Sequence, residues 1–363
     1  MMYVISGLII LVNLIFNRNK YMTIISGVFL WIGMSFNNTI VDRAQYQRMY
    51  ANPLKYNEEW GYTHLQLAAG KLGLSFQVFF AILIGACLAL VIYTIIRNTR
   101  YPGIVISLYF IFPYLMDAAQ VRSFLSACII TALIPLLLKR NVKNILLYII
   151  GIFVASLFHY SAYFFFLLLI TYLLSWKVIM PLFIAFSLAL MGNIFNLLKF
   201  LASILPFLSN KIDRYLNPEL LTDHAELRAY AIYLLMLFAL TIVTGLILNH
   251  YQDSQEKVVY RRSIKQVTQY NAMSDLMLKL DSILMIVLPL ISISVSYDRV
   301  IRTVLIIHYI YFSKVFSTSL PRLVKVLYFV TLLMFVLYYF WFFIYSRFPA
   351  AVFWPFFQGN LIF

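Results

Sequence analysis

Long apolar runs, separated by short basic segments, extend over almost the whole chain. A helix that crosses a bilayer needs about 20 mainly apolar residues, so this pattern predicts about twelve membrane-spanning helices. The predicted spans are 2–16, 21–36, 74–96, 101–116, 121–138, 144–158, 160–175, 178–198, 229–249, 281–297, 300–317 and 326–345. The predicted fold class is an all-α polytopic membrane protein, in which residues 1–363 form a single integral membrane domain.

Two neighbouring apolar runs, 144–158 and 160–175, are short for two full crossings. Tilting or a break in a longer helix can accommodate such lengths. We therefore expect either two tilted spans or one long helix that is broken near His159.

The amino-acid composition indicates the same class. Hydrophobic residues make up 63% of the chain, charged residues 11%, and the mean hydropathy is +0.88. Globular domains contain about 45–50% apolar and about 25% charged residues. These values exclude a secreted enzyme, a nucleic-acid-binding module and a disordered scaffold. Cys87 and Cys128 lie inside apolar runs, so we predict two buried thiols and no disulfide or metal site.

The net charge of +15 is spread between the apolar runs, so it indicates topology and not a nucleic-acid partner. With the amino terminus outside, sixteen of the 28 basic residues but only four of the 13 acidic residues fall on the cytoplasmic side. This asymmetry follows the positive-inside bias and places both termini outside. Segments 37–73 and 199–228 are then long outer loops. Segment 250–280 is a basic cytoplasmic loop, suited to contact with anionic membrane lipids.

Arginines, carboxylates and a histidine gather near the predicted outer face. Arg122 begins the fifth span, and Arg299 and Arg302 share one face of the eleventh. Arginine binds phosphate oxygens bidentately and keeps its charge in apolar surroundings. His159, in the run Phe-His-Tyr-Ser-Ala, or a carboxylate can take a proton from a hydroxyl group. The set predicts a substrate that carries phosphate and hydroxyl groups.

Each of these residues also has a purely structural alternative. Arg122 could reach the lipid headgroups from the start of its span. Asp298 and Arg299 could form an ion pair at a helix end, and His159 could be a packing residue.

Short motifs follow one another in a defined order. Asp42 and Tyr46 lie four residues apart, which favours one face of a short interfacial helix capped by Asp42. The later motifs are Glu59-Trp60-Gly61-Tyr62, Val121-Arg122 ahead of a helix rich in small residues, the run at His159, Asp213-Arg214-Tyr215 and Asp298-Arg299. The set resembles the EpsG family of exopolysaccharide polymerases, which are Wzy-type enzymes. The family often has Pro where Trp60 stands and Gln where Ser123 stands.

The resemblance implies a polymerase of the bacterial inner membrane that acts at the outer leaflet. Such enzymes join oligosaccharide repeat units carried on undecaprenyl diphosphate, transferring the growing chain to a hydroxyl of the next lipid-linked unit. The implied fold is related to the C-type (GT-C) glycosyltransferases and O-antigen ligases, with an outward-facing cavity. The flippase and the chain-length regulator of the same pathway become candidate partners.

The resemblance implies a role for each of the candidate residues. The acceptor hydroxyl needs a base, for which His159 is the first choice and Asp42 and Glu59 are alternatives; the carboxylates could instead hold sugar hydroxyls. The diphosphate needs cations, and the candidates are Arg122, Arg299, Arg302 and Arg214. The candidates for further substrate contacts are Tyr46, Gly61, Tyr62 and Tyr215.

No cofactor is expected for this reaction. The first outer loop contains no Asp-x-Asp pair, which a metal-using C-type enzyme can carry there, so we predict a metal-independent site. A diphosphate leaving group is already activated, and no nucleotide is needed.

Three other functions are alternatives. A flippase for lipid-linked sugars would place ionisable residues along a path near mid-membrane, whereas most of those found here lie at the predicted outer face. A membrane O-acyltransferase would depend on one histidine and leave the arginines without a role. A non-catalytic scaffold of a synthesis complex would need none of them.

Overall fold

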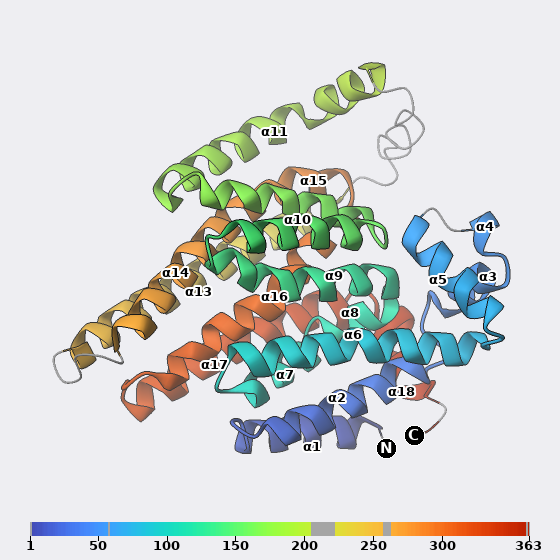
Figure 1. Cartoon of the computed structure of the whole chain (residues 1–363), viewed down its shortest axis with the longest axis horizontal. Coiled ribbons are helices and arrows are strands. Elements are labelled where there is room, and N and C mark those ends of the chain that lie inside the picture. The colour runs from blue at the N-terminus through green and yellow to red at the C-terminus, as the bar shows by residue number, and fades with distance from the viewer. Residues whose placement is uncertain (1, 57–58, 205–221, 257–262, 361, 363) are drawn as a thin grey trace. The chain divides into compact units, whose positions relative to one another are not determined.

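The computed structural model describes residues 2–56, 59–204, 222–256, 263–360 and 362 (Figure 1). Over these residues the chain is helical, and the one β-type pairing is an isolated bridge between Asn37 and Asn360. Seven described helices are long and apolar enough to cross a membrane: Phe76–Asn98, Val121–Leu138, Trp176–Phe200, His224–Tyr251, Ala272–Ile293, Val295–Ser317 and Arg322–Tyr345. The all-α membrane class is confirmed, whereas the number of twelve spans is not.

Two compact units make up the chain: unit 1 comprises residues 1–163 and 303–363, and unit 2 comprises residues 164–302. The first part of unit 1 contains α1 (Met2–Ile15), α2 (Lys20–Ser35), α3 (Arg43–Ala51), α4 (Pro53–Tyr56), α5 (Trp60–Lys71), α6 (Phe76–Asn98), α7 (Pro102–Ile111), α8 (Tyr114–Ala119), α9 (Val121–Leu133), the 3₁₀ helix η1 (Ile134–Leu138) and α10 (Val142–Ser156). Its second part contains most of α16 (Asp298–Ser313), the 3₁₀ helix η5 (Lys314–Ser317), α17 (Arg322–Phe340), the π-helical turns η6 (Trp341–Tyr345) and η7 (Pro349–Phe353), and α18 (Trp354–Gln358).

Unit 2 is built from the remaining helices. They are most of the 3₁₀ helix η2 (Tyr160–Tyr172), then α11 (Trp176–Ile204), α13 (His224–Glu256), α14 (Ser263–Leu284), α15 (Val287–Ile293), the short 3₁₀ turn η4 (Val295–Tyr297) and the first turn of α16. Within this unit α14 packs against both α11 and α13. Lys279 of α14 is buried, and its ammonium pairs with Asp275 at 2.7 Å and donates to the carbonyl of Thr171 at 3.0 Å.

Polar residues at helix ends explain why several helices begin where they do. The side chain of Asn19 accepts hydrogen bonds from the first amides of α2, Ser75 does so for α6 and Asn141 for α10. These caps satisfy amides that have no partner inside the helix. The polar segments between apolar runs therefore terminate helices as well as signalling topology.

Two predicted elements need correction. The apolar run 101–116 is not one span, because Pro113, which has no amide to donate, separates α7 from α8. The segment 250–280, expected to be a loop, is helical in α13 as far as Glu256 and again in α14 from Ser263. It contains no glycine or proline to interrupt a helix, so its polar composition alone does not make it a loop.

A break near His159, one of the two alternatives predicted for this segment, is found. Helix α10 ends at Ser156, and the chain continues from Tyr160 as a 3₁₀ helix. The predicted outer segment 37–73 also contains helices, namely α3, α4 and α5, and ring contacts of Tyr50 with Phe76 and Phe79 place α3 beside the start of α6 (Figure 1).

The carboxy-terminal segment holds the beginning of the 37–73 segment in place. The amide group of Asn37 donates to the carbonyls of Pro355 and Phe356 at 3.0 and 2.8 Å. Its side-chain oxygen accepts from the backbone amides of Thr39 and Ile40 at 3.0 and 3.2 Å. This buried asparagine thereby fixes the chain just before α3.

Candidate functional site

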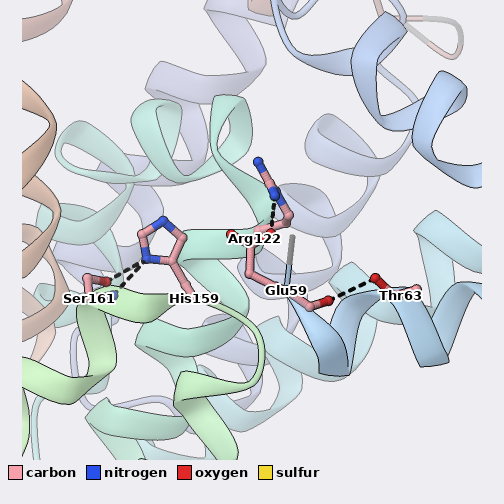
Figure 2. A network of polar contacts seen from close by, with 5 residues as sticks. All are labelled: Glu59, Thr63, Arg122, His159 and Ser161. Carbon is pink, nitrogen blue, oxygen red and sulfur yellow. Dashed lines mark hydrogen bonds and ion pairs between the residues drawn. The ribbon is translucent and has the colours of Figure 1, made fainter. Parts of the chain in front are cut away.

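An ion pair between Glu59 and Arg122 lies at the centre of the candidate site (Figure 2). Glu59 occupies the N-cap position of α5, but its side chain makes no capping hydrogen bond and instead accepts from Arg122, the second residue of α9. The Glu59 side chain is 8% exposed and that of Arg122 is 23% exposed. The Arg122 side chain is therefore partly exposed while its carboxylate partner is buried.

Gly61 explains how Glu59 reaches this position. The amide of Gly61 donates to the carbonyl of Leu157, just beyond α10, at 2.8 Å. A Cβ atom at Gly61 would lie 2.9 Å from that carbonyl oxygen and 3.0 Å from the ring of Phe158. Only glycine permits this approach without displacement. Gly61 was predicted to contact substrate, and the structure gives it this packing contact.

His159 follows directly on that contact segment. Its Nδ1 lies 2.7 Å from the hydroxyl of Ser161 and accepts a 3.2 Å hydrogen bond from the backbone amide of Ser161 (Figure 2). An amide can only donate, so this hydrogen bond assigns the acceptor role to Nδ1. The proton is then assigned to Nε2, and a neutral His159 presents a donor at that atom.

Tyr46 and Tyr62 form a buried aromatic wall behind the ion pair. Their ring centroids lie 6.2 Å apart, and the side chains are 4% and 0% exposed. Burial raises the pKa of Tyr62, and the neighbouring Tyr46 raises it further, while Arg122 lowers it. The Tyr62 phenol therefore stays neutral at neutral pH, and both rings form part of the protein core.

Asp42 occupies the N-cap position of α3, but no hydrogen bond from its side chain caps that helix. Its carbonyl accepts from the amide of Tyr46 at 2.9 Å. The structure thus confirms the predicted short helix, while the predicted capping by the Asp42 side chain is not found.

A second buried ion pair lies in unit 2, at the start of α16. Arg302 donates to Asp298 through Nε at 3.0 Å and through Nη2 at 3.2 Å, and the two residues are 5% and 7% exposed. A carboxylate in the first turn also interacts favourably with the helix dipole. Arg299 is the next residue of the same helix, whereas the predicted site residues Arg214 and Tyr215 lie outside the described residues.

Arg43, the first residue of α3, is a buried cation that the sequence pattern did not single out. It is 4% exposed and donates to the carbonyl of Ser35 at 3.1 Å and to the side chain of Gln77. Its guanidinium packs on the rings of Phe80 and Phe76, 4.3 and 5.0 Å from their centroids. The available signal was helical spacing, because Arg43 precedes the buried Tyr46 by three residues on the same face.

Among the described residues, no group of three or more His, Cys, Asp and Glu side chains is arranged to hold a metal ion. Cys87 and Cys128 are both buried and unbridged, as predicted. The candidate site in unit 1 contains a guanidinium–carboxylate pair and a histidine, and Arg43 is a second buried arginine in the same unit.

The sequence model of the EpsG family matches residues 20–357, nearly the whole chain. No curated protein and no solved structure matches the chain.

Proposed function

The chain belongs to the EpsG family, and from this premise we propose that it is a polysaccharide polymerase. It would join oligosaccharide repeat units carried on undecaprenyl diphosphate at the outer leaflet of the bacterial inner membrane, with both termini on the outer side. Family membership is consistent with a membrane protein of this type, and the apolar helices agree with it. The observation that carries the proposed chemistry is the Glu59–Arg122 pair beside His159 (Figure 2).

The reaction breaks the bond between the anomeric carbon of the growing chain and its diphosphate oxygen. A glycosidic bond forms to a hydroxyl oxygen of the next unit, the hydroxyl proton passes to a base, and the electron pair of the broken bond goes to the diphosphate. The site must therefore supply a proton acceptor and a cation for the leaving group.

In our proposal Arg122 supplies the cation. Its guanidinium already binds a carboxylate, so its geometry suits a phosphate group. When the diphosphate binds Arg122, the Glu59 carboxylate loses an ion-pair partner and becomes available to the acceptor hydroxyl. The exchange uses the partial exposure of Arg122 and needs no metal ion.

The hydrogen bonds of His159 favour Glu59 as the base among the predicted candidates. Because Nδ1 accepts from Ser161, a neutral His159 offers a proton at Nε2 instead of accepting one there. We propose that His159 donates to a phosphate or sugar oxygen. Arg299 and Arg302 remain proposed phosphate ligands, and Asp298 would hold Arg302 in a fixed orientation until an anion binds.

Complementation tests the proposal. The chain is expressed in a host that lacks its own polymerase but makes the matching repeat unit, and wild type is compared with Glu59→Gln, Arg122→Lys and His159→Ala. We expect a polysaccharide ladder from wild type and single lipid-linked units at the outer leaflet in the variants. Arg48→Ala, which removes an exposed arginine of α3, should give the wild-type ladder.

Other outcomes would contradict the proposal. Equal ladders from all variants, at equal expression, would exclude this site. Accumulation of repeat units on the cytoplasmic leaflet in cells without the protein would identify a flippase and exclude a polymerase.

A further inference from the structure

Three connections of unit 1 meet at the end that lies away from α3, α4 and α5 (Figure 1). They are the turn between α1 and α2, the turn between α6 and α7, and the connection between α16 and α17. Arg18 belongs to the first, and Lys325 lies in the first turn of α17, just after the third. Tyr101, in the second, is buried and makes hydrogen bonds to both of the other connections.

These hydrogen bonds link Arg18 to Lys325. The Arg18 guanidinium donates to the Tyr101 hydroxyl at 2.5 Å, and that hydroxyl donates to the carbonyl of Phe316 at 2.7 Å. The Lys325 ammonium donates to the same carbonyl at 3.2 Å and to the carbonyl of Thr318 at 2.6 Å. Two positive charges are therefore held near each other, and they repel.

No acidic residue compensates this pair of cations. Among the described residues, the ion pairs that form do not include Arg18 or Lys325. Arg322, three residues before Lys325 on α17, is exposed and adds a third positive charge to the same side of that helix. None of the three connections contains an acidic residue, because the acidic residues of unit 1 are Asp42, Glu58, Glu59 and Asp117.

Both cations are accessible to a ligand. The Arg18 side chain is exposed and that of Lys325 is partly exposed. A guanidinium has five N–H donors and an ammonium has three. In the described contacts Arg18 uses one of its donors and Lys325 uses two, so both keep donors for the oxygens of an anion. A phosphate group, which accepts several charge-assisted hydrogen bonds, suits this arrangement.

Exposed apolar side chains lie close to both cations in the chain. Phe16 precedes Arg18 by two residues and is exposed. Leu323 and Leu327, each two residues from Lys325, are exposed as well. In a membrane protein, exposed side chains of this kind face the acyl chains of lipids. A ligand that fits both features carries an anionic group and an apolar chain, as a phospholipid does.

We propose that Arg18 and Lys325 bind the phosphate of an anionic phospholipid, whose acyl chains contact Phe16 and the start of α17. Basic residues at the ends of membrane helices attract anionic headgroups, which concentrate in the cytoplasmic leaflet. The orientation that the charge distribution predicts places this end of unit 1 at that leaflet. Tyr101 is a positioning residue, because its hydroxyl holds Arg18 next to the carbonyl that Lys325 also binds. The inference does not depend on the polymerase reaction.

The test uses the full chain in nanodiscs of phosphatidylcholine, with and without phosphatidylglycerol as the anionic lipid. A ligand that binds the folded state raises the midpoint of thermal unfolding, and we expect the rise in Arg18→Gln to be about half that of wild type or less. Lys143→Gln is the matched control. It removes an exposed positive charge from α10 on the same predicted side of the membrane, and it should respond like wild type.

Tyr101→Phe separates a built site from the general attraction of a basic surface for anionic lipid. The variant changes no charge, but it removes the hydroxyl that holds Arg18. Each variant is compared with itself in the two membranes, so a lower stability in phosphatidylcholine alone does not affect the result. We expect a smaller rise for Tyr101→Phe than for wild type. Equal rises in wild type, Tyr101→Phe and Arg18→Gln, or no rise in wild type, would overturn the inference.

Arg18→Lys takes the place of Tyr101→Phe if that variant does not fold. It keeps the charge but lacks the planar pair of donors for phosphate oxygens, so its rise should also be smaller than that of wild type. Inorganic phosphate, added to the phosphatidylcholine nanodiscs, tests for a free anion, and we expect it to have no effect. A rise equal to that with phosphatidylglycerol would assign the site to a free anion and overturn the lipid assignment.

Discussion

The amide of Gly61 donates to the carbonyl of Leu157 at 2.8 Å, which joins the start of α5 to the segment that leads into His159. This backbone contact joins the residues just after Glu59 to the residues just before His159. The contact requires that residue 61 have no side chain, so a substitution at Gly61 tests it directly.

Gly61→Ala should reduce polymerisation strongly, because the new Cβ would meet the Leu157 carbonyl oxygen at 2.9 Å and the backbone cannot move aside cheaply. Such overpacking costs about 1–3 kcal/mol of unfolding free energy. Gly70→Ala is the control on the same helix, since nothing lies within 4 Å of a Cβ there. It should be active and as stable as wild type or more so. Wild-type activity in Gly61→Ala, measured by the polysaccharide ladder, would refute this role.

Exchanging the charges of Glu59 and Arg122 should show whether the ion pair is needed for stability alone or also for activity. Each single alanine variant leaves one charge unpaired and is expected to lose about 1–3 kcal/mol of stability, while the double exchange Glu59→Arg with Arg122→Glu recovers part of it. We expect the exchanged protein to remain inactive, because the cation would no longer project from α9. Thermal unfolding in detergent and the complementation assay measure the two effects. Restored activity would show that only the ion pair matters.

In unit 2, variants of the Asp298–Arg302 pair can also separate an effect on stability from an effect on activity. Removing one partner, as in Arg302→Met, leaves a buried uncompensated carboxylate and should cost about 3–5 kcal/mol. The double variant Asp298→Leu with Arg302→Met replaces both by apolar side chains and should unfold near the wild-type temperature. If Arg302 binds phosphate, this stable variant makes no polymer. A stable and fully active double variant would assign the pair to structure alone.

Asn37 should be essential for the arrangement of α3. Asn37→Asp keeps the acceptor for Thr39 and Ile40 but loses the donor to the carbonyls of Pro355 and Phe356, so it should be less stable than wild type. Two lost hydrogen bonds correspond to about 1–3 kcal/mol. Asn38→Ala, next to it but exposed, should be neutral. Protease sensitivity of the carboxy-terminal segment measures the effect, and equal digestion of both variants would contradict it.

Several features of the protein were predictable because they depend on local properties of the chain. The balance of apolar and charged residues predicted an all-helical membrane protein, since the transfer of apolar side chains is nearly additive along a helix. The motifs predicted the EpsG family, and the match over residues 20–357 confirms it. A break near His159 was one of two alternatives predicted for the short apolar runs 144–158 and 160–175.

Other features depend on residues that only the folded chain brings together. Glu59 and Arg122 are 63 residues apart and meet because Gly61 lets α5 approach the end of α10. Arg43 looked like an ordinary basic residue of a loop, and only the folded chain shows that it is buried against Phe80.

The sequence by itself therefore determined the membrane class, the family and the residue types of the site. The tertiary structure decided which of those residues meet: it pairs Glu59 with Arg122, orients the ring of His159 through Ser161 and buries the Tyr46–Tyr62 wall. The physical reason is the separation along the chain over which each kind of interaction acts. Hydropathy and capping act within a few residues of the chain, whereas ion pairs and close backbone contacts depend on packing between distant helices.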